Sequence, residues 1–153
     1  MIIRCPTETD TRAAAGRLAS MCRPGDVILL AGPLGSGKTA FTGGLADGLF
    51  VDEPVLSPSF VIMRRYESGF LPLIHIDVYR LGSLGEFDDI EPLEEGRDGV
   101  TVIEWGHAVA AAIPDDHLLV RFDVLGDGER VLTFVPSGVW NLRPLDTIGG
   151  ADQ

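Results

Sequence analysis

Hydrophobic and polar positions along the chain form the blocks expected of a mixed α/β protein. Two mostly apolar runs, Val27–Ala31 and Val100–Ile103, are bounded by turn residues, which is the pattern of strands buried on both faces of a parallel sheet. Near the start of the chain, Ile2–Cys5 predicts a further short strand. We therefore expect a mixed sheet whose core strands are parallel.

Two further pairs of strand-like runs predict antiparallel hairpins. The members of each pair are separated by a short polar stretch that contains glycine, and such stretches favour tight turns. The pairs are Phe60–Tyr66 with Leu71–Val78, and Leu118–Val124 with Arg130–Val135.

Three segments have patterns that favour helices flanking this sheet. Thr9–Met21 starts with acidic residues, which suit the positive end of a helix dipole. Lys38–Leu49 carries large apolar residues every four positions, although Gly43 and Gly44 weaken the prediction. Gly106–Ile113 is rich in alanine and is followed by a proline, which ends helices.

Length and composition agree with one domain. A chain of 153 residues with 45% apolar and 23% charged residues is typical of a globular protein with one core. We expect residues 1–140 to form the domain and residues 141–153, which show little periodicity, to be a loose tail. The apolar runs are far shorter than a membrane span and the N-terminus lacks a signal-peptide pattern, so we expect a cytoplasmic protein without membrane contact.

The charge of the chain restricts its partners. The net charge is −11, and because non-specific nucleic-acid affinity depends on cationic side chains, tight direct binding to nucleic acid is not expected. The only lysine among the twelve basic residues, Lys38, lies in a glycine-rich loop. Seven carboxylates gather in Glu86–Asp98, which is either a solvated acidic segment or a docking surface for a partner.

The glycine-rich segment Gly32–Thr39 matches the Walker A pattern G-x-x-x-x-G-K-[ST] at every fixed position, between a predicted strand and a predicted helix. In this motif backbone N–H groups surround a phosphate, and the first helical turn adds to the attraction. We expect Lys38 to contact the β- and γ-phosphates of ATP and Thr39 to ligate Mg²⁺. The candidate nucleotide-binding residues are Gly32, Pro33, Leu34, Gly35, Ser36, Gly37, Lys38, Thr39 and Ala40.

Two carboxylates end predicted strands and are candidates for chemistry at the metal and the attacking water. Asp77 follows Leu73–Ile76 and Glu104 follows Val100–Ile103, so both acids are expected at strand tips. For either acid alone, an ordinary solvated carboxylate is an equal alternative. His75 faces the same side of its strand as Asp77 and is more readily explained as a structural residue.

Four segments resemble the bacterial TsaE (YjeE) ATPases in their order and spacing. They are Gly32–Thr39, Ser57-Pro58-Ser59-Phe60, His75-Ile76-Asp77-Val78-Tyr79-Arg80-Leu81 and Ile103-Glu104-Trp105, and the resemblance runs from about Pro6 to Val135. It implies a P-loop α/β domain that hydrolyses ATP with Mg²⁺ and assists TsaB and TsaD in making threonylcarbamoyladenosine in tRNA. Position 59 is serine where the family commonly has threonine, a change that keeps a hydroxyl.

The resemblance also implies roles for individual residues. Lys38, Asp77 and Glu104 would be catalytic, with Thr39 and Glu104 at the metal and Asp77 positioning water. Ser57–Phe60 would form a switch-like segment near the γ-phosphate. Three more residues are expected at the nucleotide, namely Glu8, Trp105 and Arg130.

Two other functions would use the same loop. A small-molecule kinase needs an acceptor pocket and usually an arginine-rich lid, for which Arg64, Arg65 and Arg97 are the available material. A nucleotide-sensing module would bind ATP without significant hydrolysis. Phosphate release, measured with and without partners, separates these alternatives.

Overall fold

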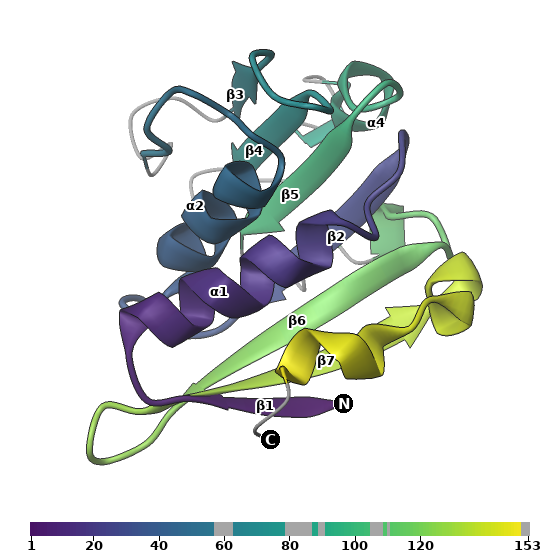
Figure 1. Ribbon diagram of the computed structural model, residues 1–153. Coiled ribbons are helices and arrows are strands. Elements are labelled where there is room, and N and C mark those ends of the chain that lie inside the picture. Colours follow the sequence, from purple (N-terminus) through teal and green to yellow (C-terminus); the bar gives the residue numbers. More distant parts are fainter. Residues whose placement is uncertain (57–62, 79–86, 89–90, 105–108, 110, 151–153) are drawn as a thin grey trace.

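The computed structural model describes residues 1–56, 63–78, 87–88, 91–104, 109 and 111–150. Its elements follow one another along the chain as strands and helices of a mixed α/β domain (Figure 1). They are β1 (Ile2–Cys5), α1 (Glu8–Ala19), β2 (Asp26–Ala31), α2 (Lys38–Gly48), β3 (Met63–Tyr66), β4 (Leu73–Asp77), α4 (Pro92–Glu95), β5 (Val100–Glu104), β6 (His117–Val124), β7 (Arg130–Ser137) and two 3-10 helices, η2 (Gly138–Leu142) and η3 (Leu145–Gly149).

One seven-stranded sheet organises the domain, with strand order β1-β7-β6-β2-β5-β4-β3. The four central strands β6, β2, β5 and β4 are parallel to one another. At the two edges, β3 pairs antiparallel with β4, β7 pairs antiparallel with β6, and β1 pairs antiparallel with β7. The expected fold class and both expected hairpins are confirmed, because β3 pairs with β4 and β6 with β7.

The central strand β2 contributes to two separate cores, one on each face of the sheet. Ile28 and Leu30 pack with residues of α1 and α2, while Val27 and Leu29 pack with the cluster on the opposite face. Side chains alternate between faces along a strand, so a strand covered on both sides requires an unbroken apolar run. Figure 1 shows α1 and α2 side by side over one face.

Glycines allow α1 and α2 to pack unusually close together. A Cβ atom at Gly44 would lie 2.3 Å from the carbonyl oxygen of Arg12, and one at Gly48 would lie 2.6 Å from that of Gly16. Neither position has room for a side chain, since backbone atoms cannot move aside cheaply. Gly44, one of the two glycines that weaken the helix prediction for this segment, is therefore part of the contact surface of α2.

The start of α1 is fixed by local hydrogen bonds. The side chain of Thr7 accepts from the backbone N–H of Asp10, and the Asp10 carboxylate accepts from the backbone N–H of Thr7. This capping box satisfies donors that a helix N-terminus otherwise leaves unpaired. The helix ends at Ala19, two residues before the predicted end.

The C-terminal segment packs against the domain, which differs from the loose tail expected for residues 141–153. Trp140 and Ile148 are fully buried, and Leu145 is nearly so. Arg17 on α1 donates to the carbonyl of Ile148 at 2.5 Å. Residues 138–150 therefore form an ordered part of the fold beside α1 (Figure 1), and residues 151–153 lie outside the described part.

Two other predicted segments are described only in part. Within Glu86–Asp98 the structure shows the short helix α4, Pro92–Glu95, with exposed carboxylates. Of the predicted helix Gly106–Ile113, residues 106–108 and 110 lie outside the described part, and residues 109, 111 and 112 have a 3-10 conformation. Among the helices that the structure describes, none is long and apolar enough to cross a membrane.

Candidate phosphate-binding site

The loop between β2 and α2 owes its shape to three glycines, which are needed for two different reasons. Gly35 and Gly37 have φ angles of 77° and 101°, which side-chain-bearing residues rarely adopt. Gly32 has no such angle, but a Cβ atom there would lie 2.7 Å from Cβ of Phe122 on β6. Gly35 and Gly37 are therefore required by their backbone conformation and Gly32 by close packing, and not by room for a ligand alone.

Lys38 is folded back over the loop that precedes it. Its ammonium donates to the carbonyl oxygens of Gly32 at 2.8 Å and Pro33 at 2.9 Å, and the residue is almost fully buried. Burial lowers the pKa of the Lys38 ammonium, while the nearby carboxylates of Glu104 and Asp77 act to raise it. The site thus holds a partly desolvated cation, which an incoming anion would stabilise.

The first turn of α2 and the Ser36 hydroxyl leave donors for such an anion. The helix starts after Gly37, which offers no side-chain cap, so its first N–H groups lack side-chain acceptors. The Oγ atom of Ser36 is buried and has no hydrogen-bond partner among the described residues. Phosphate oxygens are acceptors that suit both features, so these residues fit the phosphates of a nucleotide.

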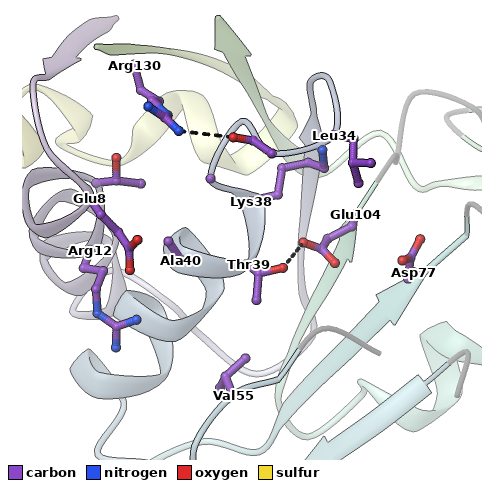
Figure 2. A pocket seen from close by; sticks show the side chains of 13 residues that line it. Glu8, Arg12, Leu34, Lys38, Thr39, Ala40, Val55, Asp77, Glu104 and Arg130 are labelled. Carbon is purple, nitrogen blue, oxygen red and sulfur yellow. Dashed lines mark hydrogen bonds between the residues drawn. The ribbon is translucent and has the colours of Figure 1, made fainter. Parts of the chain in front are cut away.

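A carboxylate pair lies beside the loop because of the sheet register. Asp77 on β4 and Glu104 on β5 are directly paired at the carboxyl ends of neighbouring parallel strands. Glu104 is buried, and its Oε1 accepts a hydrogen bond of 3.1 Å from the Thr39 hydroxyl at the start of α2. The structure thus brings together the three residues expected around a metal and a water molecule (Figure 2).

His75 lies behind this pair, within the core. It is fully buried on β4, and its Nε2 is 3.1 Å from Oε2 of Glu104. The approach is not aligned as a hydrogen bond, so we describe it as a close polar contact. His75 is therefore a core residue that also contacts Glu104, the carboxylate predicted at the metal.

Lys38, the Thr39–Glu104 pair and Asp77 border one cleft of about 670 Å³. Figure 2 shows Lys38, Thr39, Asp77 and Glu104 on one side and residues of α1 and β7 on the other. Arg130, at the start of β7, donates to the carbonyl of Gly35 at 3.1 Å and so touches the loop itself. Described residues from five elements and their loops line the cleft: Glu8, Thr11, Arg12, Leu34, Gly35, Gly37, Lys38, Thr39, Ala40, Val55, Asp77, Glu104 and Arg130.

The cleft includes residues that sequence reasoning missed. Glu8, predicted at the nucleotide, lies at the start of α1, and Arg12 lies one turn further along the same helix. Arg12 pairs with Asp47 at 2.6 Å. The helical spacing of Glu8 and Arg12 could have suggested that Arg12 shares the site with Glu8.

Other predicted residues lie outside the described part of the chain. These are the switch-like segment Ser57–Phe60, the stretch Tyr79–Leu81 and Trp105. Within the described residues there is no group of three or more His, Cys, Asp or Glu side chains that could hold a metal by themselves. Hydroxyl and phosphate oxygens are also suitable ligands for a hard cation such as Mg²⁺.

Comparisons with known proteins point to one family. The family model described as "Threonylcarbamoyl adenosine biosynthesis protein TsaE" matches residues 5–132. A protein of Bacillus subtilis named "tRNA threonylcarbamoyladenosine biosynthesis protein TsaE" is 40% identical over 129 residues, which cover 84% of this chain and 81% of the relative. A protein of the same name from Treponema pallidum is 40% identical, covering 86% of this chain and 98% of the relative.

A solved structure is similar over the whole fold. The crystal structure of YdiB from Bacillus subtilis matches with a TM-score of 0.80 and 34% identity, covering 100% of this chain and 96% of that one. Overall fold and sequence are thus similar over nearly the full length of both chains. This chain belongs to the TsaE family.

Proposed function

We propose that this protein binds and hydrolyses ATP with Mg²⁺ in the cytoplasm as an accessory factor in threonylcarbamoyladenosine modification of tRNA, acting with TsaB and TsaD. The role in this modification comes from the family, whose description and relatives carry it in their names. One observation carries the ATPase assignment, namely that Lys38 of the glycine loop and the Thr39–Glu104 hydrogen bond share one cleft.

Nucleotide binding is assigned to the loop. The Lys38 ammonium, now held by two carbonyls, would exchange part of that contact for the β- and γ-phosphates. The buried Ser36 hydroxyl and the uncapped first turn of α2 add neutral donors. Arg130 and Glu8, which line the cleft, are placed to contact the rest of the nucleotide.

The metal and water positions are assigned to the opposite wall. Thr39 and Glu104 would hold Mg²⁺, which supplies positive charge to the oxygens of the γ-phosphate when bound. Asp77, paired with Glu104 across two strands, is placed to accept a hydrogen bond from the attacking water and so orient it. Metal binding and water orientation are assigned to different side chains, so mutations can test the two roles separately.

The kinase alternative finds little support in the described residues. The guanidinium of Arg65 donates hydrogen bonds to the carboxylates of Glu67 and Asp98, and that of Arg97 donates to Glu94. Neither arginine lines the cleft. The arginines that do line it, Arg12 and Arg130, belong to α1 and to the start of β7.

An accessory role is also consistent with the charge of the chain. A net charge of −11 disfavours tight direct contact with tRNA, so we assign tRNA binding and the chemical modification to partner proteins. Groups supplied by a partner can raise hydrolysis at a P-loop by roughly 10³- to 10⁵-fold. Slow turnover by the isolated chain and faster turnover in the mixture are therefore expected.

The test is phosphate release from ATP by the purified chain, with and without TsaB and TsaD and with and without Mg²⁺. The proposal expects slow Mg²⁺-dependent release that rises in the full mixture. Transfer of the γ-phosphate to a small acceptor would support a kinase. ATP binding without phosphate release in either condition would support a sensing module and overturn the proposed hydrolysis.

A further inference from the structure

The end of α2 holds a phenylalanine in a conformation that favours glycine. Phe50 has a φ angle of 61°, which is uncommon for any residue other than glycine and unfavourable for a bulky one. Its N–H donates to the carbonyl of Asp47 at 3.0 Å, and the N–H of Val51 donates to that of Ala46 at 3.0 Å. These two bonds are those of a Schellman motif, in which the position of Phe50 is usually glycine.

Burial of the Phe50 side chain does not offset this unfavourable backbone conformation. The residue is 71% exposed, so neither core packing nor a local contact accounts for an aromatic ring at this position. A strained residue that the fold itself does not need is a reason to look for a function on the surface.

A second exposed aromatic residue is fixed next to it. Phe70, in the turn between β3 and β4, is 84% exposed, and its N–H donates to the carbonyl of Leu49 at 2.6 Å. The Ser68 hydroxyl accepts from the N–H of Asp52 at 2.9 Å. Two hydrogen bonds therefore join the segment after α2 to the β3–β4 turn and hold Phe50 and Phe70 near each other. We call these two exposed residues the Phe50–Phe70 surface.

This surface lies away from the phosphate loop. Lys38 is the first residue of the eleven-residue helix α2 and Phe50 follows its last turn, so the length of α2, roughly 16 Å along the helix axis, lies between them. Neither Phe50 nor Phe70 lines the nucleotide cleft. A molecule bound at this surface would leave the cleft open.

The charges beside the surface indicate what would bind there. Asp52 and Glu53, two and three positions after Phe50, are exposed and take part in no salt bridge among the described residues. An isologous contact between two copies would bring these carboxylates together, and an anionic membrane would repel them. A partner with an apolar pocket and basic side chains at its rim is complementary to both features.

We infer that the Phe50–Phe70 surface is a docking site for a partner protein that presents an apolar pocket bordered by lysine or arginine side chains. The two rings would act as the buried anchors, since aromatic residues dominate the binding energy of many interfaces. Asp52 and Glu53 would pair with the basic rim and speed association. The inference rests on the proposed function only in taking TsaB and TsaD as the probe proteins.

The test measures binding of TsaB and TsaD, singly and together, to the wild-type chain and to the double variant Phe50→Gly/Phe70→Ser by calorimetry. Glycine at position 50 relieves the backbone strain, so the double variant should fold at least as stably as the wild type. We expect its affinity to fall more than tenfold. The matched control is Leu142→Ser, which removes another side chain that is 87% exposed and should leave affinity unchanged.

A second arm tests the charges. The double variant Asp52→Lys/Glu53→Lys should also weaken binding, and the wild-type affinity should fall as salt is raised. ATP affinity of every variant should stay at the wild-type value, because the cleft is untouched.

Three outcomes would overturn the inference. Equal affinity of the double variant and the wild type would show that the partner docks elsewhere, while the proposed partnership would stand. Sedimentation that shows a wild-type dimer and a monomeric double variant would assign the surface to a second copy of this chain. Absence of wild-type binding to TsaB and TsaD would remove both the proposed partnership and this inference, although ATP hydrolysis would remain testable by itself.

Discussion

The Thr39 hydroxyl donates a hydrogen bond of 3.1 Å to Oε1 of Glu104, although 65 positions separate the two residues in the sequence. The contact connects the first turn of α2 to the tip of β5 and closes one wall of the cleft. A hydroxyl and a carboxylate oxygen at this distance are close enough to be ligands of the same small cation. The bond therefore links the phosphate loop to the carboxylate wall.

Replacing Glu104 by Gln tests the role of this carboxylate. The amide oxygen can still accept from Thr39, so nucleotide binding should stay largely intact, but the charge that assists the metal is lost. We expect Mg²⁺-dependent phosphate release to fall by about 10²-fold. The measurement is single-turnover phosphate release at saturating ATP, together with ATP affinity by calorimetry. Equal turnover in the variant would exclude Glu104 from the site.

The parts of the site that sequence reasoning predicts are those with a local cause. Gly35 and Gly37 are recognisable because a tight loop needs positive φ angles, and Asp77 and Glu104 because each follows a buried strand. The spacing of Glu8 and Arg12 puts both residues on one face of α1, but that this face borders the cleft depends on how α1 packs against α2. The contact between His75 and Glu104 likewise depends on the register of two strands.

Replacing Lys38 by Ala should abolish tight ATP binding. The substitution removes the cation at the loop, and charged hydrogen bonds contribute about 1.5–3 kcal/mol each, so we expect affinity to fall by at least about 10²-fold. Calorimetry with ATP measures the change. The control is Arg64→Ala, which removes an exposed cation that does not line the cleft and should leave affinity unchanged. Unaltered ATP affinity in the Lys38 variant would contradict the phosphate-binding assignment.

A third prediction concerns the contact between α1 and α2. Alanine normally stabilises a helix relative to glycine, but at Gly44 its Cβ would lie 2.3 Å from a backbone oxygen of Arg12. We expect Gly44→Ala to lower the free energy of unfolding by about 1–3 kcal/mol, measured by urea denaturation. At Gly126 a Cβ would meet no atom within 4 Å, so Gly126→Ala should be nearly neutral. Equal stability of the two variants would contradict the close helix packing.

The helices of the C-terminal segment are too short for a hydrophobic periodicity to predict them from the sequence. Its two 3-10 helices have five residues each, so no periodicity develops, yet Trp140 and Ile148 are fully buried. The contacts that hold the segment come from distant residues, Arg17 on α1 and Asp26 on β2. Such contacts become visible only once the sheet and α1 are in place.

The last prediction tests this C-terminal contact through the buried pair of Arg143 and Asp26. The guanidinium donates to both carboxylate oxygens, at 2.8 Å to Oδ1, and the two side chains are only 11% and 7% exposed. Arg143→Met leaves the Asp26 charge buried without its partner, so we expect the free energy of unfolding to fall by about 2–4 kcal/mol in urea denaturation. Adding Asp26→Asn removes the stranded charge, and the double variant should recover part of the loss. If Asp26→Asn lowers the stability of the Arg143→Met variant by as much as it lowers that of the wild type, the two residues contribute independently. That result would mean that the pair does not hold this segment to β2.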